Sequence, residues 1–300
     1  MIKTNSSPAC PFCSSQSEYY LGAPDYNRKV SRVIFKISKC LNCELMFVSN
    51  PPEDLGSYYI TDYHYIPANE AELEPLLETE KFKIDLVTQF QKQGSLLEIG
   101  PGTGMFCQLS RRAGFDVSAI EMDDKCVDFL RDTLNIRVTQ SSDPAKTLRD
   151  QARAYDVICL WHSVEHLYAP WETLDEAVNC LSPNGILVIA APNPNAWQAK
   201  MLGKRWPHHD LPRHLYAMSI PWMLAYAAKK QLSIELSTTC DEGSLFWNRF
   251  TWAMLLQKLV PGYFLRQRFW NLGMQLGRLL QFWEGREGKG ATYTIILKRL

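Results

Sequence analysis

The sequence has no excess of charge of either sign, because 32 Lys and Arg residues balance 32 Asp and Glu residues. This balance argues against a protein that holds nucleic acid by bulk charge alone. Long apolar runs are also missing: no stretch of about 18 apolar residues exists, so no transmembrane helix is expected. The first residues lack the apolar segment of a secretory signal, and we therefore expect a cytoplasmic protein.

The sequence does contain enough apolar material for a folded chain, with 46% hydrophobic and 21% charged residues among 300. Its charge is unevenly distributed. Residues 245–300 hold nine basic and two acidic side chains, whereas residues 1–244 hold 23 basic and 30 acidic ones. The C-terminal segment is therefore a basic region on an otherwise acidic chain.

The N-terminal region carries two C-x-x-C pairs, CPFC and CLNC. Two such short knuckles let four thiolates converge on one zinc ion. Disulfides or redox cysteines are the alternative, and they are rare in the cytosol. Four thiolates leave no open position for water, so we expect a structural zinc ion that stabilises a ribbon of short strands over residues 1–50. The predicted zinc ligands are Cys10, Cys13, Cys40 and Cys43.

We expect a connector and helix at residues 51–94, followed by a β-α-β unit. The apolar pattern of that unit predicts strands at residues 95–99 and 115–120 and a helix at residues 105–113. A glycine-rich turn joins the first strand to the helix. The turn GPGTG lets backbone approach a ligand without a Cβ in the way. Glu121 ends the second strand, where an acid binds ribose hydroxyls in nucleotide-binding βαβ units.

The ligand of this turn is predicted from Glu98, which lies two residues before the first glycine. A carboxylate there would repel a diphosphate, but it suits a ligand that has an ammonium group and no phosphate. S-adenosylmethionine (SAM) combines an amino acid, a sulfonium, a ribose and an adenine. We therefore expect SAM; a glycine turn that binds nothing is the alternative.

The order of these motifs resembles class I SAM-dependent methyltransferases. LLEIGPGTG resembles their motif I, and YDVICLWHSVEHL with LSPNGILVIAAPNP resembles the subgroup related to the ubiquinone-biosynthesis O-methyltransferase. The N-terminal cysteine pairs resemble a branch that bears a zinc ribbon. The resemblance implies an α/β fold: a Rossmann-like seven-stranded methyltransferase sheet with an N-terminal zinc ribbon and a C-terminal helical insertion. The SAM-binding core would span residues 95–244 and 286–300, with the insertion at 245–285.

The resemblance also implies which residues contact the cofactor. Glu98 would hold the methionine part together with the turn glycines Gly100, Gly102 and Gly104. Glu121, which ends the second strand, would bind the ribose. Met122 and Asp143 would lie near the adenine, and Trp161 would lie beside the sulfonium and ribose.

Transfer of a methyl group to a hydroxyl needs a base, and neutral histidine suits this role near physiological pH. The segment HSVEH follows the predicted fourth strand, and the loop at residues 206–216 follows the fifth. Ligands bind beyond the carboxyl ends of the strands in open α/β sheets, which places both segments near the methyl group. Asp210 and Arg213 could instead pin the loop. The candidate bases are His162, His166, His208 and His214.

Residues 245–283 hold ten aromatic side chains among 39, interleaved with Arg and Lys. The pattern predicts two amphipathic helices split at Pro261-Gly262. Such helices suit a membrane interface, which would place the protein on the inner face of the membrane. Packing on the core or on a second copy in a homodimer is the other interpretation, and both remain open.

These features favour a SAM-dependent methyltransferase that acts on a small molecule, such as a sugar, a glycolipid intermediate or a related metabolite. We expect O-methylation by in-line transfer with a histidine base. The alternative is an RNA methyltransferase that binds nucleic acid through its zinc ribbon and basic C-terminal segment, against which the zero net charge argues. A non-catalytic zinc module that kept the SAM-binding fold is the third hypothesis.

Overall fold

The structure is a computed structural model that describes residues 8–59 and 65–299. It divides into two compact units. The first consists of Met1–Tyr59, Ala191–Ala225 and Ser237–Thr294, and the second of Ile60–Ala190, Tyr226–Leu236 and Ile295–Leu300. The region that holds the four N-terminal cysteines therefore belongs to the same unit as loop 206–216 and the helical insertion.

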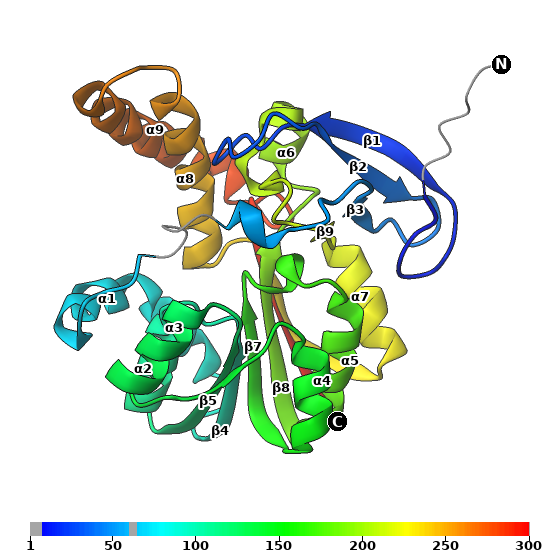
Figure 1. Cartoon of the computed structure of the whole chain (residues 1–300), viewed down its shortest axis with the longest axis vertical. Coiled ribbons are helices and arrows are strands. Elements are labelled where there is room, and N and C mark those ends of the chain that lie inside the picture. Colours follow the sequence, from blue (N-terminus) through cyan, green and yellow to red (C-terminus); the bar gives the residue numbers. More distant parts are fainter. Residues whose placement is uncertain (1–7, 60–64, 300) are drawn as a thin grey trace. The chain divides into compact units, whose positions relative to one another are not determined.

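The first unit contains a four-stranded sheet with the order β1-β2-β3-β9 (Figure 1). All three neighbouring pairs are antiparallel. The last strand comes from the loop that follows residue 206, and its Ala217 pairs with Met46. The ribbon thus gains a strand from a distant part of the sequence. The strands are β1 Ser17–Ala23, β2 Phe35–Cys40, β3 Met46–Val48 and β9 Tyr216–Ala217.

The insertion in the first unit is a pair of helices, α8 (Glu242–Gln257) and α9 (Tyr263–Glu284). They are separated at Pro261-Gly262, as the sequence predicts. The helices approach closely because Gly273 and Gly277 face α8: a Cβ at Gly277 would lie 2.6 Å from the Cα of Arg249. Short helical segments complete this unit: η1 Gly56–Tyr58, α6 Trp197–Leu202, η4 Gly203–Arg205 and η5 Pro207–His209.

The main sheet has seven strands in the order β10-β11-β8-β7-β4-β5-β6. The pairs β4–β5, β4–β7, β5–β6 and β7–β8 are parallel. The last two strands of the chain lie together at one edge, and the predicted fold class is confirmed. The strands are β4 Gly94–Ile99, β5 Phe115–Glu121, β6 Arg137–Gln140, β7 Tyr155–Trp161, β8 Leu181–Pro192, β10 Leu232–Thr238 and β11 Thr292–Arg299.

Helices alternate with the strands of this sheet, and polar side chains start several of them. The side chains of Asn69, Asp123 and Asp143 each cap a helix. Each accepts a hydrogen bond from a backbone N–H in the first turn, which would otherwise have no partner within the helix. The first helix ends at Val87, whereas the predicted connector and helix extend to residue 94. After Val87 the backbone N–H groups of Gln89 and Phe90 bond to carbonyls three residues earlier, which forms turns in place of further α-helix. The helices are α1 Glu70–Val87, α2 Met105–Arg112, α3 Asp124–Asp128 with η2 Phe129–Thr133, α4 Pro144–Gln151, η3 Val164–His166, α5 Pro170–Asn179 and α7 Ile220–Lys229.

The central strands are buried on both faces, which explains their continuous apolar sequences. Leu96, Val157 and Val188 are each fully buried in this core. Two cysteines outside the ribbon, Cys107 and Cys159, also lie in it as small apolar side chains.

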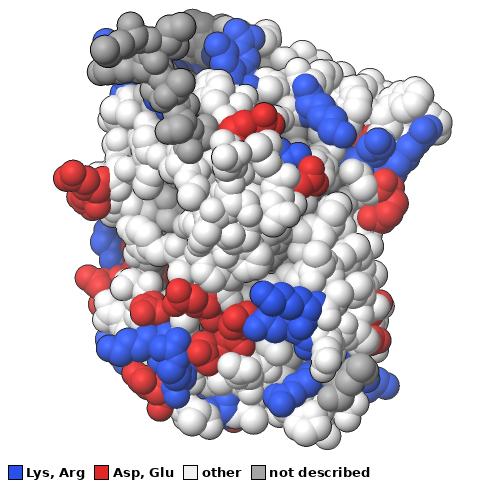
Figure 2. Space-filling model, turned by 90° about the vertical axis from the view of Figure 1, so that its right-hand side faces the viewer, with Lys and Arg blue, Asp and Glu red and all other residues white. Residues whose placement is uncertain are grey.

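The described helices include none that is both long and apolar enough to cross a membrane. On the face shown in Figure 2, Asp and Glu side chains lie next to Lys and Arg side chains.

Candidate functional site

The predicted cofactor turn connects β4 to α2. The strand order reverses at β4, because β5 lies on one side of it and β7 on the other. In parallel sheets, ligands bind beyond the carboxyl ends of the strands at such a point. Gly100, Gly102 and Gly104 all adopt positive φ angles of 73°, 56° and 74°. The Gly100 N–H donates to the carbonyl of Ile120, which ties the start of the turn to β5.

Two of these glycines are required by the packing of the chain itself. A Cβ at Gly100 would lie 2.7 Å from the Cβ of Ser163, and a Cβ at Gly104 would collide with Leu130. The sequence interpretation explained all three glycines by approach to a ligand. The structure adds a second reason at two of them, because a neighbouring side chain fills the space that a Cβ would need.

Glu121 at the end of β5 is hydrogen-bonded to this turn. Its Oε2 accepts a hydrogen bond from the N–H of Gly102 at 2.9 Å. Its Oε1 accepts hydrogen bonds from the N–H groups of Met122 and Asp123 at 2.7 and 2.9 Å. The carboxylate is almost fully buried. Three backbone donors therefore fix it beside the glycine turn.

Glu98 lies in β4 and is 3% exposed. Its Oε2 accepts a hydrogen bond from the thiol of Cys107 at 3.0 Å. Burial raises the pKa of Glu98 to about 7, although the Lys83 ammonium acts in the opposite direction. A cationic group placed beside this carboxyl would favour its ionised form. The chain thus provides a buried acid that gains from a positively charged ligand.

The two residues predicted near the adenine lie on segments that follow the second and third strands of the unit. Met122 is 55% exposed, directly after Glu121. Asp143 is exposed and caps α4 by accepting the N–H of Lys146 at 3.0 Å. A contact of either residue with a nucleoside stays a prediction.

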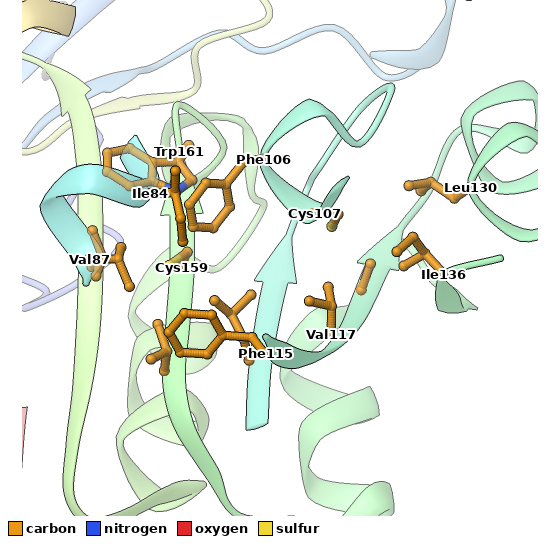
Figure 3. Packing of buried hydrophobic residues seen from close by; sticks show 14 of the residues in the cluster. Ile84, Val87, Phe106, Cys107, Phe115, Val117, Leu130, Ile136, Cys159 and Trp161 are labelled. Atoms are coloured by element: carbon orange, nitrogen blue, oxygen red, sulfur yellow. The ribbon is translucent and has the colours of Figure 1, made fainter. Parts of the chain in front are cut away.

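Trp161 ends β7 and packs in the core of the second unit (Figure 3). Its ring meets Phe106 at 5.5 Å and Phe82 at 6.4 Å between ring centres, both edge-on. The Lys83 Nζ lies 5.2 Å from the same ring. These contacts give Trp161 a packing role, and its predicted contact with the sulfonium stays a prediction.

The HSVEH segment directly follows β7. His162 has a φ of 54°, and its N–H donates to Ala190, which continues the pairing with β8. Its Nδ1 lies 3.7 Å from the buried Oε1 of Glu165. His166, half-buried, ends the η3 turn in which Glu165 lies. The structure therefore places an imidazole and a carboxylate together after β7.

Ser163 is a site residue that the sequence analysis missed. Its hydroxyl donates to the carbonyl of Ile99 at 2.6 Å, just before the glycine turn. Its Cβ fills the space beside Gly100. The only sequence signal is a small polar residue after a strand, which is too common to identify a role.

The four N-terminal cysteines converge in the first unit. Their sulfur atoms all lie within 4.8 Å of one another, and three pairs are 3.5 to 3.7 Å apart. A zinc ion with four sulfur ligands at about 2.3 Å gives sulfur–sulfur distances of about 3.8 Å. The N–H groups of Asn42 and Cys43 both point to the Cys40 sulfur at 3.4 Å. This geometry fits a tetrahedral zinc ion held by Cys10, Cys13, Cys40 and Cys43.

The histidines of loop 206–216 have different surroundings. The Nε2 of His208, which is mostly buried, lies 2.9 Å from the Thr251 hydroxyl of α8. Burial lowers the pKa of His209 to about 4, so this ring is neutral at pH 7. His214 donates from Nδ1 to the carbonyl of His208 at 2.9 Å.

Arg213 pins this loop to the ribbon, as the sequence analysis allowed. Its guanidinium donates to Asp25 and Asp210, with shortest distances of 2.7 and 2.8 Å, and to the carbonyl of Tyr58 at 3.2 Å. Asp25 was not recognised from the sequence, because its partner is distant along the chain. Bonds from Arg213 and from backbone N–H groups lower the pKa of Asp25 although burial opposes them.

A methyltransferase domain model matches residues 72–227, which is just over half of the chain. The chain belongs to the methyltransferase domain family. This assignment confirms the resemblance that motif I and the strand-four segment indicate. The matched range contains the glycine turn, Glu121 and the HSVEH segment of this methyltransferase.

Curated relatives are ubiquinone biosynthesis O-methyltransferases. The chain is 24% identical to the Shewanella pealeana enzyme over 155 residues, which is 48% of this chain and 64% of that enzyme. It is 24% identical to the Bordetella avium enzyme over 181 residues, which is 56% of this chain and 74% of that enzyme. The chain thus spans under two thirds of the Shewanella relative.

A solved methyltransferase structure shares the fold. A SAM-dependent methyltransferase from Archaeoglobus fulgidus aligns with a TM-score of 0.50 and 18% identity. The alignment covers 74% of this chain and 94% of that one.

Proposed function

We propose that this methyltransferase transfers a methyl group from SAM to an oxygen atom of a small molecule. The observation that carries the proposal is the position of Glu121, held by the N–H of Gly102 beside the buried Glu98. Two acids at one turn suit a ligand with ribose hydroxyls and an ammonium group. A diphosphate would lie against negative charge at this turn.

Four groups of the chain would hold SAM. Glu98 would face its ammonium group, the turn at Gly100–Gly104 would lie against its methionine part, and Glu121 would accept its ribose hydroxyls. Met122 offers an exposed apolar side chain for the adenine. When bound, SAM supplies an activated methyl group, so the protein must exclude water, align the acceptor and remove its proton.

His162 is the proposed base. It follows β7 in the same unit as the glycine turn, and Glu165 can orient its ring through the Nδ1 side. His166 and His214 remain candidates that act on the acceptor. His208 suits this role less well, because it is mostly buried and bonded to Thr251. The names of the curated relatives support oxygen as the atom methylated.

The zinc ion proposed at the four cysteines has a structural role. Four sulfur ligands fill a tetrahedral site, so no position is left for a reacting group. The ion would stabilise strands that share a sheet with β9, the strand that follows loop 206–216.

Ligand binding tests the cofactor directly. Calorimetry should show that SAM binds and that NAD does not, and Gly102→Asp should abolish SAM binding because a second carboxylate would lie against Glu121. Gly203→Asp is a matched control, because that glycine also has positive φ and lies outside the turn. NAD binding in preference to SAM would overturn the proposal.

Methyl transfer tests the acceptor class. The chain is incubated with methyl-labelled SAM and with sugar nucleotides, lipid extracts or RNA, and the products are analysed by mass spectrometry. Label in a small molecule supports the proposal. Label in RNA, with binding that weakens steeply as salt rises, would favour the RNA methyltransferase instead.

A further inference from the structure

The outer side of α9 is rich in exposed apolar side chains. Phe264, Leu279 and Phe282 are 83%, 78% and 69% exposed. Soluble monomeric proteins seldom expose so many large apolar side chains on one helix. We call the set the α9 face, and its apolar members are Phe264, Leu265, Leu272, Leu279, Phe282 and Trp283.

These residues lie on one side of the helix. Leu265, Leu272 and Leu279 are seven residues apart, and Phe282 and Trp283 follow after one more turn. The opposite side holds Gly273 and Gly277, which are buried against α8. A helix of 22 residues is about 33 Å long. The α9 face therefore extends along most of a helix whose other side is already occupied.

Basic side chains accompany the α9 face. In and just after α9, Arg266, Arg268, Arg278 and Arg286 are all exposed. Among the described residues, no ion pair joins any of these arginines to an acid. Glu284, the single acid of α9, is fully buried and accepts bonds from Gln198 and Trp252. Glu287, which follows Arg286, is exposed and accepts hydrogen bonds from Thr238 and Thr239. The exposed surface of the helix itself is therefore apolar and positively charged.

Arg286 also stacks on the aromatic end of the face. Its guanidinium carbon lies 4.7 Å from the Phe282 ring and 4.6 Å from the Trp283 ring. An aromatic ring with a cation beside it matches the boundary between acyl chains and headgroups.

Two occupants are conceivable: a second copy of this chain and a lipid surface. Two α9 faces pressed together would bring the arginines of both copies close, without an acid on the helix to pair with them. An anionic phospholipid surface offers both an apolar layer and negative charge. Charge complementarity therefore favours lipid.

We propose that the α9 face docks the protein on the surface of an anionic phospholipid bilayer. The helix lies in the interface, with its apolar side chains among the acyl chains and its arginines at the headgroups. This inference does not depend on the proposed reaction, because it concerns binding to a surface in the absence of SAM.

Vesicle flotation with the full-length chain tests it. The protein should float with vesicles of phosphatidylcholine and phosphatidylglycerol, and at least tenfold less with phosphatidylcholine alone. Raising the salt concentration should weaken the binding. The variant Leu279→Glu/Phe282→Glu should lose at least tenfold in vesicle binding, and Arg268→Glu/Arg278→Glu should lose the preference for anionic lipid.

Val33→Glu is the matched control, since it changes an apolar side chain that is 50% exposed in the first unit but outside the insertion. It should float like the unmodified chain. Circular dichroism and SAM binding show whether each variant is folded. If folded Leu279→Glu/Phe282→Glu binds vesicles as before, the proposal is wrong. It is also wrong if sedimentation shows a dimer that this variant converts to monomer, with no vesicle binding by either form.

Discussion

Arg213 and Asp25 form a fully buried ion pair across 188 residues of sequence. The shortest contact joins Nη2 to Oδ1 at 2.7 Å, and a second runs from Nη1 to Oδ2 at 3.3 Å. Asp25 follows β1 of the ribbon, and Arg213 lies in the loop that leads to β9. The pair therefore fixes the histidine-bearing loop to the ribbon, in addition to the pairing of β3 with β9.

Removing one partner of this pair should destabilise the first unit. Asp25→Ala leaves the Arg213 charge buried with less compensation, and we expect a loss of about 3 kcal/mol in the free energy of unfolding. Chemical denaturation followed by tryptophan fluorescence measures it. Asp116→Ala is the control, because Asp116 pairs with Arg137 and Arg153 on the exposed surface, where such pairs contribute little. Equal losses for both variants would contradict the structural role of the buried pair.

SAM affinity should rise with pH through the range in which Glu98 ionises. Burial raises the pKa of Glu98 to about 7, so the free protein holds it mostly neutral below that pH. An ammonium group binds the ionised form, and the dissociation constant should fall roughly 20-fold between about pH 5.5 and 7.5. Calorimetry at a series of pH values measures this change.

Glu98→Gln is the control for that experiment. Its neutral amide has the same shape and does not titrate, so its affinity for SAM should be lower at pH 7.5 and nearly independent of pH. A pH dependence that persists in this variant would assign the titration to another group.

Gly100→Ala should impair both folding and SAM binding. The new methyl group would meet Ser163 at 2.7 Å in a backbone conformation with positive φ. We expect a loss of about 2 kcal/mol in stability, by thermal denaturation, together with weaker SAM binding. Gly114→Ala isolates the clash, because Gly114 also has positive φ but has no atom within 4 Å of its Cβ position. It should lose less stability and keep its SAM affinity.

The sequence was sufficient for features whose cause lies within a short segment. The burial of β4 and the glycines of the turn both follow from local patterns, and so does the separation of α8 from α9 at Pro261-Gly262. Features that join distant segments were not predictable. The sequence gives no sign that Ala217 adds a strand beside Met46, or that Asp25 receives Arg213.

Ser163 illustrates the same limit at the candidate site. Its importance follows from contact with Gly100 and Ile99, on a strand 64 residues earlier. Trp161 shows the reverse case. The resemblance indicates a ligand contact, whereas the structure shows packing against Phe106 and Phe82, and a side chain at a strand end can do both.

Zinc removal should loosen the ribbon and the loop attached to it. Cys40→Ser removes one ligand, and zinc content should fall well below one ion per chain. Hydrogen exchange should then accelerate in β2, β3 and residues 211–217, because β9 pairs with β3. Exchange in β4, β5 and β7 of the other unit should be unchanged. Full zinc content, or unchanged exchange in the loop, would contradict this dependence.

His162 should be needed for transfer but not for SAM binding. If its imidazole removes the acceptor proton, His162→Ala should lower kcat by about 10²- to 10⁴-fold. The dissociation constant of SAM should stay within a factor of about three, because the groups proposed to hold SAM are Glu98, the glycine turn and Glu121. His208→Asn is the informative comparison: its ring forms a hydrogen bond with Thr251 in the first unit, so its loss should reduce stability more than it reduces kcat. If His162→Ala keeps the normal kcat, the base must be sought at His166 or His214.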